Sequence, residues 1–483
     1  MNTSPPDTTP LLRFKDLALA RGSAPVLHGI NWTVRPGEHW LVTGNNGVGK
    51  SSLAEAVSGR HRVTSGQRSW PGLTGERFQA IRTVSFTDSG RLFHNANAVH
   101  YYQQRFNAFD ADGHLTVRDY LLANGHDEAS AVAALSHLNA TDLLDLERIK
   151  LSSGQTRKLL LAKALAGQPE ILIIDNPYLG LDARSRSRLN TLLDDLVSNN
   201  GVSLILVGMT DAPPTCITHR LHLKEGTIAF QGNFSDYPID TVPKRATDEP
   251  ITDIVRYFQE TAKAPDYDQV LKLVNVSVAY GKKVVLDQLN WLVKPGEQWV
   301  VSGNNGSGKS TLLSLIYADH PQAYANRIHL FGRRRGRGES IWDIKRRIGF
   351  TSPELHAFFD GSLTAREVLL SGLNDTFRPP KTITSAQEDL LHALLRFSGL
   401  ALHTSKPFRQ FSTGEQRLLL LLRALIKAPP VLLLDEPFQG LDAKTIERCR
   451  RLLDAVLTPE RTLIFISHFR AEVPEGVGLE LGL

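Results

Sequence analysis

The sequence predicts an α/β protein in which one structural unit occurs twice along the chain. Two glycine-rich loops share the pattern Gly-Asn-Asn-Gly-x-Gly-Lys-Ser, and their lysines, Lys50 and Lys309, stand 259 residues apart (309 − 50). Two apolar runs that end in aspartate, 171–174 and 431–434, follow the loops at nearly the same spacing. Such unbroken runs are typical of strands buried in a parallel sheet. The repeat therefore predicts two similar cassettes.

Each glycine-rich loop lies between a predicted strand and a predicted helix. In the second half, apolar residues 299–301 precede the loop and 312–316 follow it. This order predicts a phosphate-binding P-loop, because loop N–H groups and the positive end of the helix surround a polyphosphate. Lys309 would reach the β- and γ-phosphates, and the Ser310 hydroxyl would reach Mg²⁺. The loop residues expected to hold nucleotide are Gly303, Asn304, Asn305, Gly306, Ser307, Gly308, Lys309, Ser310 and Thr311 in the second half, and Gly44, Asn45, Asn46, Gly47, Val48, Gly49, Lys50, Ser51 and Ser52 in the first.

Turn signals and helical periodicity place the other elements of each half in the same order. A Pro-Gly turn, at 35–38 and again at 294–297, separates two predicted strands ahead of each loop. Helical periodicity at 114–146 and 363–402 predicts a helical subdomain in each half.

Composition shifts predict the domain boundaries. Residues 1–10 are expected to be a disordered leader, 11–237 the first cassette and 270–483 the second. The stretch 238–269 is rich in Pro, Asp, Lys and Thr and predicts a linker, with a short helix near 251–261.

Length and composition are those of an ordinary globular protein of two or three domains. The chain has 483 residues, 41% of them hydrophobic and 22% charged, so each domain can bury its own core. The most apolar stretch, 418–434, is interrupted by Arg423 and Lys427, and no stretch has the length of a membrane span. The N-terminus lacks a signal-peptide pattern, and the two cysteines form no metal or redox motif. We therefore expect a cytoplasmic protein.

The net charge of +5 is concentrated in one segment. Residues 333–347 contain seven basic and two acidic side chains, and the remainder of the chain is balanced. Arginines with an interleaved tryptophan, Trp342, suit nucleic acid or anionic lipid. The alternative interpretation is a solvated Arg/Gly turn, since charge runs are usually solvated faces.

Two further motifs complete the repeat. A Ser-Gly segment precedes each apolar run, at 151–155 and 411–415, and Gly-Leu-Asp follows it, at 180–182 and 440–442. Four motifs in this order, present twice, resemble the ATP-binding-cassette (ABC) ATPases over nearly the whole chain outside the leader and linker.

The resemblance implies two P-loop NTPase cassettes, each a mixed sheet with a RecA-like core and an α-helical subdomain. It also implies ATP and Mg²⁺ as cofactors and ATP hydrolysis as the activity. In this family two cassettes pair head to tail, so that each ATP lies between one P-loop and the Ser-Gly signature of the other cassette. Pairing within one chain would let a monomer form both sites.

The resemblance implies a nearly complete set of catalytic groups around the second P-loop. Asp435 would hold Mg²⁺, Glu436 would act as general base, and His468 would contact the γ-phosphate. Tyr280 would stack on adenine. A positioned general base contributes roughly 10²–10⁴-fold in rate. The opposing signature would contribute Ser152, Gly154 and Gln155.

The site at the first P-loop is expected to be degenerate. Lys50, Ser51 and Asp175 are present, so ATP and Mg²⁺ binding is expected. Asn176 stands in the position of the base, and an amide cannot accept a proton at neutral pH. The other departures are Met209 for the histidine, Arg21 for the tyrosine, and Thr413 and Glu415 in the opposing signature beside Ser412 and Gly414. We predict one hydrolytic site and one that holds ATP; the alternative is that both sites hydrolyse it.

One family feature is replaced in both halves. The family places a glutamine after the strand that follows the P-loop, where it touches Mg²⁺ and links the site to a membrane partner. Here Glu354 and Asp88 stand in those regions and are the candidates to replace it.

The basic segment, combined with the segments 319–322 and 413–415 and the twin cassette, resembles the ModF type. These are tandem ATPases associated with molybdate-transport genes and also described as photorepair proteins. The first hypothesis is the ATP-binding subunit of a transporter, at the inner face of the cell membrane beside a separate permease. The second is a soluble regulatory ATPase that acts on the ribosome or nucleic acid. A third is DNA binding or repair through residues 333–347.

Overall fold

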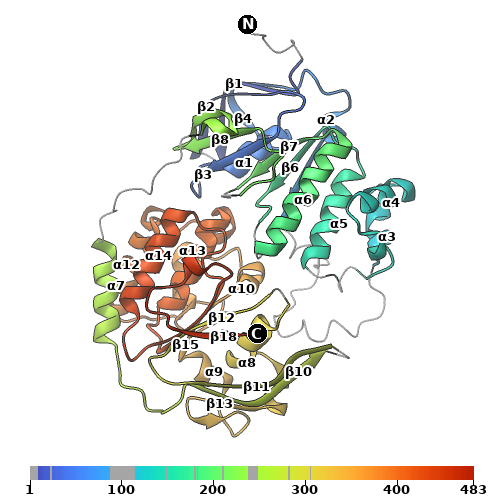
Figure 1. The fold of residues 1–483 in the computed structure, drawn as a ribbon. Helices are drawn as coiled ribbons and strands as arrows, with labels where there is room; N and C mark the ends of the chain where they lie inside the picture. Colours follow the sequence, from blue (N-terminus) through green and yellow to red (C-terminus); the bar gives the residue numbers. More distant parts are fainter. Residues whose placement is uncertain are drawn as a thin grey trace. The chain divides into compact units, whose positions relative to one another are not determined.

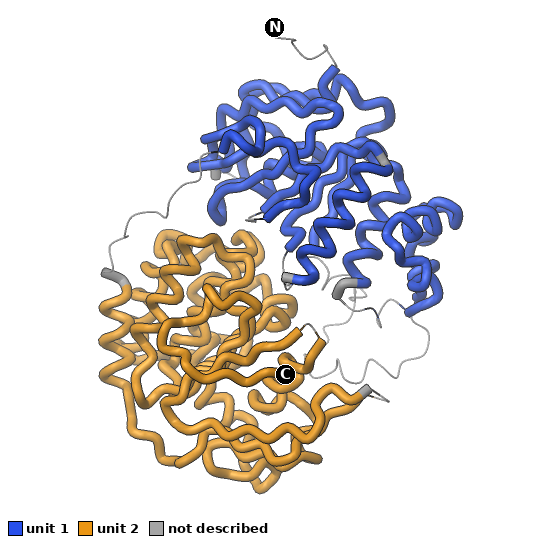
Figure 2. Tube along the Cα trace, viewed as in Figure 1, with its two compact units in different colours: residues 1–100, 104–241 blue, residues 101–103, 242–483 orange. Residues whose placement is uncertain are grey.

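The computed structural model describes most of the chain and shows two compact units. The described residues are 9–21, 24–86, 115–147, 151, 153–178, 181, 183–208, 212–237, 249–280, 283–304 and 306–483. The first unit comprises residues 1–100 and 104–241, and the second comprises residues 101–103 and 242–483 (Figure 2). Most of the predicted leader lies outside the described residues.

The first unit contains a six-stranded sheet and a smaller antiparallel sheet (Figure 1). The large sheet has the order β5-β6-β7-β3-β8-β9 and is parallel from β5 to β8, and the small one has the order β2-β1-β4. The strands are β1 (Leu12–Arg21), β2 (Ala24–Val34), β3 (Trp40–Gly44), β4 (Val63–Ser69), β5 (Ile81–Ser85), β6 (Ile171–Asp175), β7 (Ser203–Val207), β8 (His219–Lys224) and β9 (Thr227–Asn233). The α-helices are α1 (Lys50–Val57), α2 (Arg77–Ala80), α3 (Val117–Ala123), α4 (Glu128–His137), α5 (Ser153–Leu165) and α6 (Ala183–Asn200).

The second unit repeats this plan with a five-stranded parallel sheet. Its order is β15-β16-β17-β12-β18, and the antiparallel sheet has the order β11-β10-β13-β14. The strands are β10 (Leu271–Tyr280), β11 (Lys283–Val293), β12 (Gln298–Ser302), β13 (Arg327–Leu330), β14 (Arg333–Arg334), β15 (Ile348–Thr351), β16 (Val431–Asp435), β17 (Thr462–Ile466) and β18 (Leu479–Gly482). The α-helices are α7 (Glu249–Glu260), α8 (Lys309–Ile316), α9 (Ile341–Lys345), α10 (Pro353–Phe358), α11 (Ala365–Ser371), α12 (Ser385–Ser398), α13 (Thr413–Leu425) and α14 (Ala443–Val456).

The unbroken apolar runs are explained by a sheet that is covered on both faces. In β16, Leu432 and Leu434 belong to the core beneath α12, α13 and α14, whereas Val431 and Leu433 belong to the core on the other face, beneath α8 and β10. All four side chains are fully buried. Neither face meets water, so neither selects polar residues.

Both parallel sheets bring the glycine-rich loop and the strand-ending aspartate to the same edge. In the first unit β3 and β6 both pair with β7, and in the second β12 and β16 both pair with β17. Asp175 lies level with Val207, and Asp435 lies level with Ile466. Since the carboxyl ends of parallel strands meet at one edge, each P-loop faces its aspartate. The predicted α/β fold with two cassettes is confirmed.

Helix α7 lies in the stretch that composition assigns to a linker, and it packs onto the second unit. It contacts α12 and α14, and its Ile254 and Phe258 are fully buried. Arg461 fastens its end: the guanidinium donates to the carbonyls of Phe258 (2.7 Å), Ala428 (2.6 Å) and Pro429 (2.8 Å). It also lies over the Phe258 ring. The amphipathic pattern of α7 thus serves packing within the unit.

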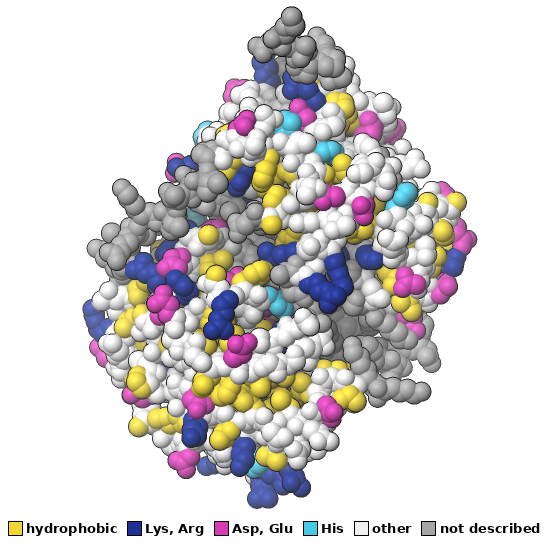
Figure 3. All heavy atoms as spheres, in the orientation of Figure 1, with side chains coloured by type: hydrophobic (Ala, Val, Ile, Leu, Met, Phe, Trp, Pro, Cys, Tyr) yellow, Lys and Arg dark blue, Asp and Glu magenta, His cyan; other side chains and the backbone are white. Residues whose placement is uncertain are grey.

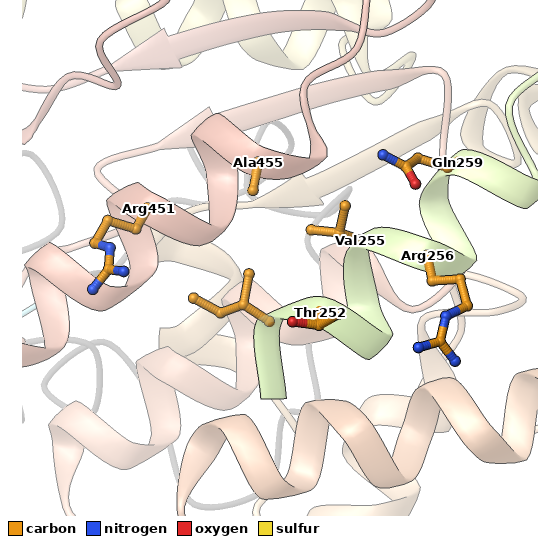
Figure 4. A pocket seen from close by; sticks show the side chains of 7 residues that line it. Thr252, Val255, Arg256, Gln259, Arg451 and Ala455 are labelled. Carbon is orange, nitrogen blue, oxygen red and sulfur yellow. The ribbon is translucent and has the colours of Figure 1, made fainter. Parts of the chain in front are cut away.

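A hollow of about 410 Å³ lies where α7 meets α14 (Figure 4). Its lining residues are Ile251, Thr252, Val255, Arg256 and Gln259 of α7, with Arg451 and Ala455 of α14. None of them belongs to a nucleotide motif, so this hollow is a feature of helix packing and not the predicted site.

We expect Arg461→Ala to destabilise the second unit by about 3 kcal/mol. The substitution leaves three carbonyl acceptors without a charged donor, and hydrogen bonds to charged groups contribute about 1.5–3 kcal/mol each before compensation by water. The measurement is urea unfolding of the full chain, read at the transition of the second unit. Arg256→Ala is the matched control: this arginine lies on α7 with its side chain 64% exposed, so its loss should cost less than about 0.5 kcal/mol. Equal costs would show that Arg461 does not fasten α7.

Candidate active site

The two P-loops adopt the same backbone conformation. Gly49 and Gly308 cap their helices with φ of +105° and +104°, in the left-handed region. A Cβ atom at Gly308 would lie 2.8 Å from a Leu286 methyl carbon, and one at Gly49 would lie 2.7 Å from Leu27. Glycine is therefore required at both positions by conformation and by space. Asn305 lies outside the described residues.

Both P-loop lysines are held by carbonyls of their own loops. The Lys309 ammonium donates to the carbonyls of Gly303 (2.7 Å) and Asn304 (2.8 Å). The Lys50 ammonium makes the equivalent bonds to Gly44 (2.8 Å) and Asn45 (2.9 Å). An ammonium has three donors and can take phosphate oxygens in the same place. The first P-loop is thus as well formed as the second.

The serine and aspartate predicted to hold Mg²⁺ lie together in each unit. The Ser51 hydroxyl donates to Asp175 at 2.9 Å, and the Ser310 hydroxyl lies 3.4 Å from Asp435. Burial, followed by the neighbouring Glu436 and Glu354 carboxylates, raises the pKa of Asp435 to about 8. Within the described residues, no three His, Cys, Asp or Glu side chains form a ready-made metal cluster. A hydroxyl, a carboxylate and phosphate oxygens are the ligands that Mg²⁺ prefers, so the donor set fits this ion.

Glu436 is held between two side chains beside this carboxylate. Its Oε2 accepts a 2.5 Å hydrogen bond from the Gln439 amide, and its Oε1 lies 3.0 Å from Nε2 of His468. Glu436 also has a φ of +44°, an uncommon conformation for a glutamate. Residues in such conformations persist where the surroundings over-determine them, and they cluster at functional sites. Gln439 was not predicted; its signal was its position three residues after Glu436.

His468 presents a buried ring nitrogen that lacks a hydrogen-bond partner in the described structure. Its Nε2 is close enough to Glu436 for an electrostatic contact, but the angle does not suit a hydrogen bond. Ser307 of the P-loop likewise has a buried hydroxyl without a partner among the described residues. A buried polar atom left unpaired is costly, and a ligand that pairs with it recovers this cost. Both atoms are suited to receive a phosphate.

A buried arginine lies near the two carboxylates and was also missed from sequence. Burial lowers the pKa of Arg417, on α13, to about 10, while the charges of Glu436 and Asp435 oppose that shift. The equivalent Arg157 of the first unit instead donates to the carbonyl of Pro177 at 2.6 Å. A guanidinium at this depth offsets part of the negative charge that gathers around Asp435.

The first unit has a different arrangement around its aspartate. Asn176 has a φ of +53°, which asparagine tolerates better than glutamate does. Its amide donates to Asp175 at 3.0 Å. Arg21, at the position of Tyr280, forms a half-exposed ion pair with Glu55 at 3.9 Å. Met209 lies outside the described residues.

In the second signature segment, the polar groups of Ser412 and Glu415 bond to each other and cap helix α13. Glu415 accepts from the Ser412 N–H (2.7 Å) and hydroxyl (2.8 Å), and its own N–H bonds back to that hydroxyl. This capping box explains a glutamate in that position, because it satisfies the first turn of α13. Gly414 is buried in the same turn. In the first unit, Gly154 and Gln155 lie in the first turn of α5, and Ser152 lies outside the described residues.

The predicted replacement for the family glutamine can be located in one unit. Glu354 lies on α10 close enough to raise the pKa of Asp435, whereas Asp88 lies outside the described residues. Two residues on, His356 bonds to Gln416 at 2.8 Å. The Gln416 amide donates to the carbonyls of Phe408 and Phe411, so its oxygen accepts from the His356 ring. This bond links the Glu354 segment to the signature helix α13.

We expect His356 to make the fold sensitive to acid. Burial and the Arg417 charge lower its pKa from 6.5 to about 4, so the neutral ring is the stable form. The stability that it contributes is fully present above pH 6.5 and is lost as pH falls toward 4. The loss should be about 2–3 kcal/mol, since the ring is mostly buried and a tenfold difference in proton affinity corresponds to about 1.4 kcal/mol. In thermal unfolding measured from pH 7 to pH 4, the melting temperature of His356→Gln should fall less steeply with decreasing pH than that of the parent protein. The exposed His392→Gln is the control, and an unchanged slope in His356→Gln would contradict the assignment.

Most basic side chains of the segment 333–347 form ion pairs with carboxylates of the same unit. The ion pairs are Arg335–Glu339 (3.0 Å), Lys345–Asp319 (2.6 Å), Arg346–Asp343 (3.2 Å) and Arg347–Asp266 (3.1 Å). Within the described chain, Arg333, Arg334 and Arg337 are exposed and form no ion pair. Basic side chains group at the end of the second unit where β13 lies (Figure 3). The pairing favours a structural role for most of this segment.

A P-loop that faces a strand-ending aspartate, present in each unit, defines the class of P-loop nucleotide-binding proteins. The ABC transporter family model matches residues 27–179 and 286–439, and the chain belongs to this family. It is a tandem ABC ATPase, which binds and hydrolyses ATP. None of the described helices combines the length and the apolar character that a membrane span requires.

Three similar proteins align with this chain over most of their length. The chain is 35% identical over 455 residues to the ABC transporter ATP-binding protein ModF of Escherichia coli K12. The alignment covers 92% of this chain and 90% of that protein. The chain is 32% identical over 482 residues to an ABC transporter ATP-binding protein of Schizosaccharomyces pombe, with 96% of each chain covered. A Saccharomyces cerevisiae ABC transporter ATP-binding protein is 31% identical over 379 residues, covering 71% of this chain and 70% of that one.

Proposed function

We propose that this ATPase is the motor subunit of a transporter and that its two nucleotide sites differ in chemistry. The second P-loop site hydrolyses ATP, and the first holds it. The observation that carries this proposal is the pair of residues after the strand-ending aspartates. Glu436 lies beside His468 and Gln439, whereas Asn176 donates its amide to Asp175. A carboxylate can accept the proton of an attacking water, and an amide cannot.

In the hydrolytic site, each residue has one proposed task. Lys309 and the loop N–H groups hold the phosphates, and Ser310 with Asp435 would hold Mg²⁺, which supplies charge neutralisation when bound. Glu436 takes the proton of the attacking water while Gln439 orients its carboxylate. The unpaired Nε2 of His468 contacts the γ-phosphate. The Glu354 carboxylate replaces the glutamine that the family places near the metal.

Head-to-tail pairing of the cassettes is part of the proposal. The second P-loop then faces residues 152–155 of the first cassette, and the first P-loop faces residues 412–415 of the second. Because the Ser412 hydroxyl bonds to Glu415, this second signature is less available to a phosphate. The departures around the first P-loop and those in the second signature would therefore lie in the same composite site. This favours a site that retains ATP without hydrolysing it.

The transport role is proposed from the relatives, which are described as ABC transporter ATP-binding proteins. It requires a separate membrane permease and places the protein at the cytoplasmic face of the membrane. Resemblance to the ModF type suggests molybdate as the transported anion.

The test is purification of the tagged full chain from detergent-solubilised membranes. We expect an integral membrane protein to co-purify in stoichiometric amount and to change the ATPase rate. Co-sedimentation with ribosomes on a sucrose gradient, without a membrane partner, would contradict the transport role and support the regulatory alternative. A salt-dependent DNA gel shift that depends on Arg333 and Arg334 would support the DNA-binding alternative.

A further inference from the structure

Near Tyr280, the backbone of β10 on its edge away from β11 forms hydrogen bonds with side chains and not with a neighbouring strand. β13 pairs with β10 only from Leu271 to Val274. Beyond this point the Asn326 amide bonds to both the N–H (2.9 Å) and the carbonyl (3.0 Å) of Ser277. The Gln322 amide does the same at Ala279, with bonds of 3.4 Å and 2.9 Å. Each amide offers one donor and one acceptor, as a strand residue does, so the two together extend the ladder to the end of β10.

His320 continues this series to the Tyr280 side chain. Its Nδ1 accepts a bond from the Gln322 N–H at 3.1 Å, and its Nε2 lies 2.8 Å from the Tyr280 hydroxyl. Because Nδ1 acts as acceptor, the hydrogen-bond network assigns the ring proton to Nε2, which donates to the tyrosine oxygen. His320 is 2% exposed and Tyr280 is 37% exposed, so a buried anchor holds a ring that is presented to solvent.

The same segment is attached to the helix that carries the P-loop lysine. The N–H groups of Asp319 and His320 both donate to the Ser314 carbonyl, at the end of α8. The other side of the hairpin touches the start of α8, because Val285 and Leu286 of β11 lie against Gly308. Hydrogen bonds at the end of α8 and packing at its start thus connect the P-loop helix to the anchor of Tyr280.

The described residues of the first unit show no such arrangement. There β4 pairs along β1 as far as Leu19, and the residue in the position of Tyr280 is Arg21. Its contact is the 3.9 Å ion pair with Glu55. At the end of this strand, the second unit therefore differs from the first in the segment 320–326 and in the aromatic ring that it holds.

We propose that His320 is a positioning residue that holds the Tyr280 ring against the purine of the nucleotide at the second P-loop, with Gln322 and Asn326 fixing the strand end beneath it. This inference rests on the proposed function of the second site. It predicts that the device contributes to recognition of the base and not to the grip on the phosphates.

The experiment uses calorimetry to compare the binding of Mg²⁺–ATP and of Mg²⁺–tripolyphosphate to the full chain. All variants also carry Lys50→Met, which removes binding at the first P-loop, so that the measured affinity is that of the second. His320→Ala should weaken ATP about three- to tenfold, the range of one hydrogen bond, and leave tripolyphosphate unchanged. Tyr280→Phe keeps the ring and removes the hydroxyl, so it should produce the same loss. The double variant should be no weaker than either single one, because both remove the same bond. His320→Gln can still donate and should restore much of the affinity.

The controls separate the possible failures. Tyr324→Phe changes an exposed aromatic residue of the same segment and should have no effect on either ligand. Equal weakening of ATP and tripolyphosphate by His320→Ala, additive losses in the double variant, or no loss at all would overturn the proposal. Absence of ATP binding in the parent protein, with its fold intact, would instead contradict the proposed function.

Discussion

Glu436→Gln should lower the steady-state ATPase rate by roughly 10²–10⁴-fold, whereas Asn176→Ala should change it less than about twofold. The glutamine is nearly the same size and keeps contact with Gln439, but it cannot accept the proton of the attacking water. At the equivalent position of the other unit an amide is already present, and it donates to Asp175. Removing it takes away no base.

The measurement is phosphate release at saturating ATP, together with nucleotide binding to show that each variant still folds and loads. Glu436→Gln should retain ATP with at least the affinity of the parent, because one of two neighbouring carboxylates is neutralised. The Asp435 carboxylate, whose pKa is raised by burial and by Glu436, is then less crowded by negative charge. If both substitutions slow hydrolysis to the same extent, the proposed asymmetry is wrong.

Lys309→Met and Lys50→Met should separate the two sites even though their lysines are equivalent in structure. Both ammonium groups donate to two carbonyls of their own loops. Loss of either should reduce the binding stoichiometry from two nucleotides to one. Only Lys309→Met should also abolish hydrolysis, by at least about 10²-fold, because the remaining site has Asn176 in place of a base. Lys50→Met should leave a residual rate that varies with how strongly the sites are coupled.

Stoichiometry by equilibrium binding and rate by phosphate release are both needed for this pair. Residual hydrolysis in Lys309→Met comparable to that in Lys50→Met would show that the first site is catalytic. Two bound nucleotides in Lys50→Met would show that the lysine is dispensable for holding ATP there. Arg346→Met, an exposed cation of the second unit, is the matched control and should change neither quantity.

The fold was largely predictable, because its signals are local. The spacing between the loops, the apolar runs and the Pro-Gly turns is read directly from residue order, and the sheets form as that order predicts. The helix predicted near 251–261 is present as α7, but its packing onto the second unit was not predicted, because the composition of this stretch indicates a linker. Its Ile254 and Phe258 are core residues, and the arginine that fastens it, Arg461, is about two hundred residues away.

The candidate site was predictable where family motifs list a residue type and a position. The roles of Glu436, His468 and Tyr280 stay predictions of this kind. Gln439, Arg417 and His320 could not be assigned in the same way, since each acts through a partner that is brought close only by folding. Composition also overstated the positive charge that residues 333–347 offer to a ligand, because four of the seven basic side chains form ion pairs with carboxylates in the folded chain.

Residue order alone establishes that the chain is a tandem repeat with two P-loops and that one half has an asparagine where the other has a glutamate. These facts depend on identity and spacing, and no folding is needed to read them. Tertiary structure decided which charges are paired, that Glu415 caps its own helix, and that Tyr280 is anchored from beneath. The physical reason is that a hydrogen bond or ion pair requires two groups within about 3 Å, and the distance between residues far apart in sequence is set by packing.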